Sequence, residues 1–202
     1  MRFRLLVLSF VLLLPTASFA QNFGVMESAE TIDRGNFKFR INPMLFFGND
    51  VADEDHGVTF MAGYGFTDKF DVEGGVALYD GVHIFGGNAE FWLMKRKPFD
   101  LSIIPGLHVV RGDRALDSTG VDFTVLASKH MTSKLDLYGA LDFAFESVTD
   151  DRVRDANYKT VHLVPGIEYK VHRDVDLLAE VGIGLNDPAA NYFSVGVAFY
   201  LR

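Results

Sequence analysis

Apolar residues alternate with small or polar ones along most of this chain. A period of two is typical of β-strands whose two faces meet different surroundings. The clearest segment has Leu135, Leu137, Gly139, Leu141, Phe143 and Phe145 on one face, with Asp136, Tyr138, Ala140, Asp142 and Ala144 on the other. The same test predicts ten strands, at about 37–47, 57–66, 70–79, 83–94, 99–110, 119–130, 135–146, 159–170, 175–185 and 191–202. The chain is therefore predicted to be all-β.

The connections between these segments are of two kinds. One short corner recurs at every second connection, as "TDKFDVEGG" (67–75), "KRKPFDLSI" (95–103), "TSKLDLYGA" (132–140) and "HRDVDLLAE" (172–180). The connections between the corners are longer on average and more variable. Short turns at one end and longer loops at the other are typical of an antiparallel up-and-down transmembrane β-barrel. The aspartate of each corner is predicted to point into the mouth of the barrel. Eight or twelve strands stay open as alternatives, because 83–94 and 99–110 are the least regular segments.

The distribution of glycine indicates which face of the barrel points outward. Nine glycines fall on the polar face (Gly63, Gly65, Gly75, Gly86, Gly106, Gly166, Gly182, Gly184 and Gly196) and three on the apolar face (Gly74, Gly87 and Gly139). A water-facing exterior rich in glycine and poor in charge would be unusual for a soluble protein, whereas a slim lumen needs small side chains. The apolar face is therefore predicted to contact lipid. A soluble periplasmic barrel, with the apolar face inward, is the alternative.

The first 20 residues have the features of a secretory signal peptide. Arg2 and Arg4 precede an apolar run, and Ser18-Phe19-Ala20 supplies small residues before a cleavage site. Residues 21–36 are then predicted to form a periplasmic lead, and 37–202 the barrel. There is no cysteine, so neither a disulfide nor a lipid-anchored cysteine is expected. Removing Arg2 and Arg4 leaves 19 − 2 = 17 basic against 27 acidic residues, which makes nucleic acid an improbable partner.

The chain resembles the small outer-membrane β-barrel proteins of Gram-negative bacteria, the porin-like and OmpA-barrel-like group of outer membrane protein β-barrel domains. The resemblance covers 37–202 and is carried by the strand spacing, the asymmetry of the connections, corners such as "FTDKFDVEGG" and the lead-in "AETIDRGNFKF". It implies location in the outer membrane, contact with outer-membrane lipid and lipopolysaccharide, and insertion by the assembly machinery. Such proteins usually end on an aromatic residue, whereas this chain ends "FYLR". Oligomeric state is left open.

Projecting the polar face inward predicts a cluster of charges in the lumen. Its members are Lys38, Arg40, Glu73, Glu90, Asp142, Glu168 and Glu180. Charges in a narrow, poorly hydrated interior should pair, because an isolated buried charge is costly. The cluster is therefore predicted to be either a salt-bridged plug or a charged constriction that favours cations.

Catalysis is not predicted. His108 and His162 point inward, but they lie on nonadjacent strands and no nucleophile or third ligand stands at a spacing that fixes a site. No catalytic residue, metal or cofactor is expected. The predicted function is that of a porin-like narrow channel or a structural barrel. The alternatives are a closed barrel that binds a surface partner through its loops and, less favoured, a barrel enzyme that modifies lipid A.

Overall fold

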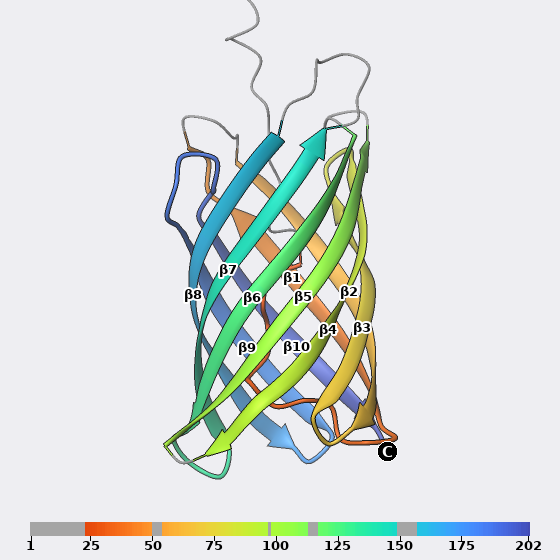
Figure 1. The fold of residues 1–202 in the computed structure, drawn as a ribbon, viewed down its shortest axis with the longest axis vertical. Coiled ribbons are helices and arrows are strands. Elements are labelled where there is room, and N and C mark those ends of the chain that lie inside the picture. Colours follow the sequence, from red (N-terminus) through yellow and green to blue (C-terminus); the bar gives the residue numbers. More distant parts are fainter. Residues whose placement is uncertain (1–22, 50–53, 97, 113–116, 149–156) are drawn as a thin grey trace, which may run out of the picture.

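The computed structural model describes residues 23–49, 54–96, 98–112, 117–148 and 157–202, and these residues form ten antiparallel strands (Figure 1). The strands are β1 (Phe37–Phe46), β2 (Asp55–Thr67), β3 (Phe70–Tyr79), β4 (Val82–Arg96), β5 (Phe99–Gly112), β6 (Ser118–His130), β7 (Leu135–Val148), β8 (Asn157–His172), β9 (Val175–Gly184) and β10 (Tyr192–Leu201). Every predicted strand is present, with both ends within two residues of the prediction. The predicted signal peptide, 1–20, lies outside the described residues.

Each strand pairs with its neighbours in sequence, and β1 also pairs with β10 to close the barrel. Phe37 lies opposite Leu201 in this closing pair, so the start of β1 and the end of β10 meet at the same end as the short turns (Figure 1). We call this end the short-turn mouth. The four corner aspartates, Asp71, Asp100, Asp136 and Asp176, are all buried, as predicted. The up-and-down topology predicted from the connections is confirmed.

The outer face of the barrel is apolar. Leu107 on β5 and Val121 on β6 are 63% and 57% exposed, and exposed phenylalanine, leucine, valine and isoleucine side chains recur on every strand. The polar residues between them are buried inside. A closed sheet with this orientation is stable in hydrocarbon, because every backbone group is paired and the outer band matches lipid. No helix among the described residues is long and apolar enough to cross a membrane.

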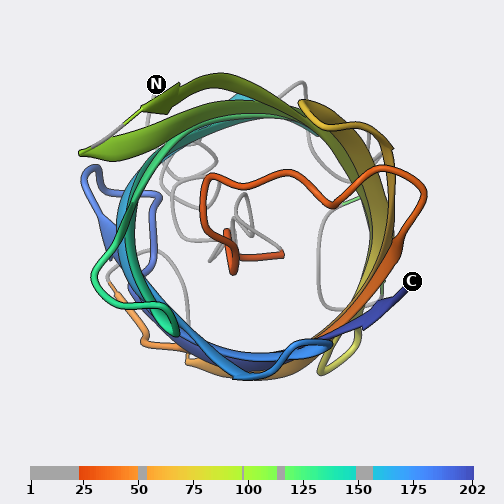
Figure 2. The ribbon, with the colours of Figure 1, turned by 90° about the horizontal axis from the view of Figure 1, so that it is seen from below.

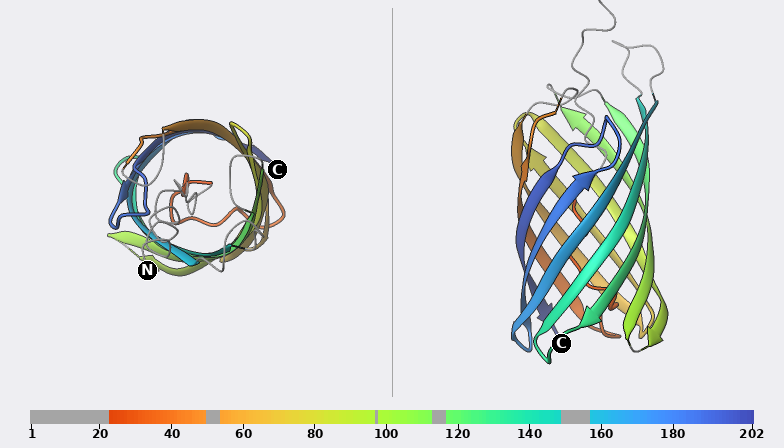
Figure 3. Two further views of the ribbon diagram at one scale, coloured as in Figure 1. Left: turned by 90° about the horizontal axis from the view of Figure 1, so that it is seen from above. Right: turned by 90° about the vertical axis from the view of Figure 1, so that its left-hand side faces the viewer.

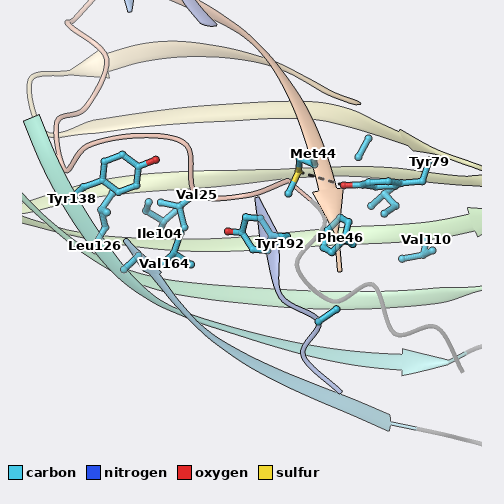
Figure 4. Close-up of a cluster of buried hydrophobic side chains, with 14 of the residues drawn as sticks. Val25, Met44, Phe46, Tyr79, Ile104, Val110, Leu126, Tyr138, Val164 and Tyr192 are labelled. Carbon is cyan, nitrogen blue, oxygen red and sulfur yellow. Dashed lines mark hydrogen bonds between the residues drawn. The ribbon is translucent and has the colours of Figure 1, made fainter. Parts of the chain in front are cut away.

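The inner face is less uniformly polar than the alternation predicts. A cluster of buried apolar and aromatic side chains projects into the lumen from several strands (Figure 4). The rings of Phe46, Tyr79 and Tyr192 pack at its centre, with centroids 5.6 Å apart for both Phe46–Tyr79 and Phe46–Tyr192. These residues lie at the ends of β1 and β3 and at the start of β10. These three rings therefore occupy the end of the lumen away from the short-turn mouth, while the cluster continues along the lumen to Leu126 and Tyr138.

Residues 23–36 form the N-terminal segment, of which 23–32 lie inside the barrel and 33–35 are exposed at the short-turn mouth (Figures 2 and 3). The sequence predicts a periplasmic lead for 21–36, and within the described part of that lead the structure places 23–32 in the lumen. The side chains of 25–29, together with Thr31 and Ile32, are buried against the barrel wall. The segment forms no helix or strand, so its backbone amides need other partners in this enclosed space. The wall supplies those partners.

Candidate functional site

Glu180 on β9 is the main anchor of the N-terminal segment. Its carboxylate accepts hydrogen bonds from the backbone N–H groups of Val25 and Met26, at 3.0 and 2.7 Å. It also accepts hydrogen bonds from the hydroxyl groups of Tyr138 and Tyr192, at 2.8 and 2.9 Å. A carboxylate offers about four acceptor positions, so Glu180 is saturated. Because two of its four donors belong to the segment, this residue ties the segment to the wall.

Three further hydrogen bonds continue this attachment along the segment. In each, a backbone N–H of the segment donates to a side chain of the wall. The pairs are Ser28 with Glu168 at 3.1 Å, Ala29 with the Ser128 hydroxyl at 3.1 Å, and Ile32 with Asp71 at 2.6 Å. All five of these contacts, with the two to Glu180, are made to main-chain groups, which every non-proline residue carries.

A buried cluster of four charges forms the centre of the site. Lys38 Nζ lies 3.0 Å from both Glu27 Oε2 and Glu73 Oε1. The Arg40 guanidinium lies 2.8 Å from Glu73 and 3.5 Å from Glu27, and it also donates to the carbonyl oxygens of Val25 and Met26. None of the four charged side chains is more than 5% exposed. With two cations and two carboxylates, the cluster is neutral overall, which offsets part of the cost of burial.

The seven residues predicted for the lumen cluster are all buried inside the barrel. The structure brings Lys38, Arg40 and Glu73 together, and it adds Glu27, which the sequence analysis does not single out. Glu168 and Glu180 bind backbone amides of the segment, as described above.

The other two predicted residues lie apart from the four-charge cluster. Asp142 accepts a hydrogen bond from the Thr124 hydroxyl. Glu90 on β4 lies opposite Asp71 of β3 in the strand pairing. Among the described residues, no ion pair joins Glu90 or Asp142 to a lysine or arginine.

His108 and His162 both point inward, as predicted. Both ring nitrogens of His108 have partners, whereas Nδ1 of His162 has no hydrogen-bond partner among the described residues. His108 Nδ1 lies 2.7 Å from Asp122, and Nε2 lies 3.2 Å from Glu146. His162 Nε2 donates to the carbonyl oxygen of Ala190 at 3.0 Å. Since both ring nitrogens of His108 face carboxylates, neither is positioned to activate a hydroxyl nucleophile.

The short-turn mouth contains an open cavity of about 580 Å³. It is lined by the N-terminal segment, by the ends of β8 and β10 and by residues of the β6–β7 and β8–β9 turns. In the β8–β9 turn, a hydrogen bond from Arg173 lowers the pKa of Asp174 below its ordinary value. This solvent-filled entrance ends where the N-terminal segment fills the barrel.

No protein-family model matches the chain, and no curated protein matches its sequence. Solved structures do match. An outer membrane channel from Pseudomonas putida F1 is 8% identical with a TM-score of 0.55, and the match covers 86% of this chain and 98% of that one. The structure named KdgM porin is 14% identical with a TM-score of 0.47, over 82% of this chain and 99% of that one. The chain therefore has the fold of an outer-membrane β-barrel.

Proposed function

We propose that the protein is a porin-like barrel of the outer membrane, without catalytic chemistry, and that it forms a narrow channel which the N-terminal segment closes. The signal peptide predicted at 1–20 fits export to that membrane, where lipid and lipopolysaccharide would surround the apolar band. The pairing of both ring nitrogens of His108 with carboxylates supports the absence of catalysis at that residue. Figure 2 shows the segment crossing the interior of the ring of strands.

The observation that carries the channel proposal is that the wall leaves room which the N-terminal segment occupies. A Cβ atom at Gly65 would lie 2.3 Å from the carbonyl oxygen of Ile32, which is too short for a side chain, so this wall position needs glycine while the segment is present. A Cβ atom at Gly86 would lie 2.7 Å from the Phe23 ring and also 2.8 Å from the carbonyl oxygen of Leu107 in the neighbouring strand, so the wall itself contributes to the need for glycine there. A purely structural barrel of this size can fill its interior with wall side chains alone. Withdrawal of the segment would leave a passage.

The passage would favour cations. The carboxylates of Asp71, Glu168 and Glu180 bind amides of the segment, and they would face water once it left. Glu73 would keep Lys38 and Arg40, but these two cations would lose Glu27. Rings and clusters of carboxylates select cations in narrow pores.

Conductance across planar lipid bilayers tests this proposal. We expect the wild-type barrel to be closed most of the time, and deletion of residues 23–33 to give steady, cation-selective current. A second variant keeps the segment in place. The chain has no cysteine, so Ala29→Cys with Ser128→Cys introduces a single disulfide between segment and wall. Oxidation should abolish any wild-type opening events, and reduction should restore them.

A folded but silent deletion variant would reject the channel and support a closed barrel that binds a surface partner. One observation favours that second candidate, since the cluster around Phe46, Tyr79 and Tyr192 narrows the far end of the lumen. Much of the predicted binding surface, at 50–53, 113–116 and 149–156, lies outside the described residues. Heat-modifiable migration on gels establishes that each variant is folded before its conductance is compared.

A further inference from the structure

Three side chains with metal-binding atoms converge at the short-turn mouth. They are Glu30 of the N-terminal segment, Asp100 at the start of β5 and His130 at the end of β6. His130 Nε2 lies 3.0 Å from Glu30 Oε1 and 3.6 Å from Asp100 Oδ2. One ligand atom from each residue lies within 4.8 Å of the other two. The three residues come from separate parts of the sequence, and the closed barrel brings them together.

A fourth residue fixes the orientation of the imidazole. The Asp136 carboxylate, on β7, hydrogen-bonds His130 Nδ1, and its side chain is only 2% exposed. With Nδ1 held in this way, Nε2 points at the two other carboxylates. Histidine ligands of metal ions usually have a carboxylate on their second nitrogen, because it fixes the tautomer and the ring orientation. Asp136 stands in that position.

The Asp100 carboxylate is only loosely paired. Its side chain is 8% exposed, and its charged partner among the described residues is His130 Nε2, at 3.6 Å. That separation is too long for a hydrogen bond. An ion between Asp100, His130 and Glu30 would coordinate the carboxylate directly.

We propose that Glu30, Asp100 and His130 bind a divalent transition-metal ion, with Zn²⁺ as the best match. Zn²⁺ binds histidine nitrogen and aspartate or glutamate oxygen, so these three side chains offer ligands of accepted types, and water would complete four-coordination. Ligand atoms about 2.0–2.2 Å from a tetrahedral Zn²⁺ lie roughly 3.3–3.6 Å apart. The 3.6 Å separation of His130 and Asp100 falls in that range, and the 3.0 Å separation of His130 and Glu30 would widen slightly when the ion binds. His130, with 49% of its side chain exposed, gives the ion access from solvent.

The site joins the N-terminal segment to the wall, because Glu30 belongs to the segment and the other two ligands to β5 and β6. Bound metal would therefore hold the segment in the barrel. Lys170 works against the ion. Its Nζ lies 3.3 Å from Glu30 Oε2 and 3.2 Å from Asp136 Oδ2, so its charge lies beside the site while Glu30 Oε1 remains available. The site goes beyond the proposed channel, and it does not depend on conduction.

Titration with Zn²⁺ by calorimetry, and with Co²⁺ by visible absorption, tests the site in the full chain folded in detergent and carrying no polyhistidine tag. We expect one Zn²⁺ per chain in the wild type. His130→Ala and Asp100→Asn should abolish this binding, and Lys170→Gln should strengthen it. Asp136→Asn should weaken binding by about 10- to 100-fold, the usual effect of losing a residue that orients a histidine ligand.

His172→Ala is the matched control, since His172 is an exposed histidine at the same mouth that the proposed site does not use. It should bind Zn²⁺ as the wild type does. Heat-modifiable migration verifies that each variant is folded. The proposal is overturned if the wild type shows no saturable binding, or if the His172 and His130 variants lose binding equally. Because the readout is binding, a silent channel would leave this result intact.

Discussion

Replacement of Glu180 by glutamine changes the main anchor of the N-terminal segment with little change in shape. Glu180 Oε1 accepts hydrogen bonds from Val25 N–H and Tyr192, and Oε2 accepts hydrogen bonds from Met26 N–H and Tyr138. In either orientation, the glutamine amide nitrogen faces one backbone N–H and one tyrosine hydroxyl. The hydroxyl can rotate and accept a hydrogen bond, but the backbone N–H cannot. One buried N–H is therefore left without an acceptor.

The size of the effect follows from these contacts. An unsatisfied buried N–H costs about 1–3 kcal/mol, and the two bonds retained by the glutamine oxygen each lose about 1 kcal/mol with the charge of their acceptor. Relief from burying a charge offsets part of this sum. We expect Glu180→Gln to lower the free energy of unfolding by about 3 kcal/mol. The part of this loss that comes from the hydrogen bonds to Val25 and Met26 cannot exceed the free energy with which the segment docks in the barrel, because the segment would undock instead.

Urea unfolding in detergent micelles, followed by the emission of the single tryptophan, Trp92, measures this difference. Glu168→Gln is the matched control, because Glu168 accepts one backbone hydrogen bond from the segment, and a glutamine oxygen can replace that acceptor. It should cost about 1 kcal/mol or less. If the two variants are equally stable, or if Glu180→Gln is as stable as the wild type, the wall carboxylates are not what anchors the segment.

Two further pairs of variants test the inside and the outside of the barrel. Gly65→Ala places a Cβ 2.3 Å from the carbonyl oxygen of Ile32, so it should cost about 1–3 kcal/mol through overpacking and should speed proteolysis of the N-terminal segment. Gly139→Ala, which meets no atom within 4 Å, should change stability by less than about 0.5 kcal/mol. Leu141→Arg, midway along the outer face of β7, should cost about 2–4 kcal/mol in a lipid bilayer, whereas Leu185→Arg near the loop end should cost about 0–1 kcal/mol. Equal costs for the two arginine variants would contradict the placement of Leu141 at the middle of the membrane and Leu185 near its surface.

The strands could be predicted from sequence because membrane and lumen impose opposite demands on alternate residues. Along β7, Leu137 and Leu141 must match lipid while Asp136 and Asp142 face the interior, so a shift of one residue would exchange the two environments. The irregular region around β4 and β5 obeys the same rule. Its pairing shifts between Trp92 and Met94, which explains why the alternation there is harder to follow. The strand count of ten is nevertheless correct.

The location of the N-terminal segment could not be predicted in the same way. The wall binds the amides of Val25, Met26 and Ile32, and an amide carries no information about its side chain. These backbone contacts leave no characteristic sequence pattern, and the side-chain ion pairs that Glu27 and Glu30 add with Lys38 and Lys170 involve only two residues of the segment. A signal is present on the wall instead, in inward-facing glycines such as Gly65 and in carboxylates that outnumber the inward-facing cations. Both fit a lumen occupied by another segment, but both fit a narrow open lumen equally well, so neither identifies the occupant.

The inward-facing carboxylates outnumber the inward-facing cations, and the structure explains this excess without a permanently open, cation-selective pore. While the N-terminal segment is docked, Asp71, Glu168 and Glu180 are acceptors for otherwise unsatisfied amides, and their charge contributes to closing the barrel. If the segment leaves, the same groups lose those donors and would line a water-filled passage as uncompensated negative charge. Closing the lumen and selecting cations would then be two states of one set of residues. A weakly docked variant such as Glu180→Gln therefore tests closure and cation selectivity together. It should open more often than the wild type. Because it lacks one carboxylate, it should select cations less strongly than the variant in which 23–33 are deleted.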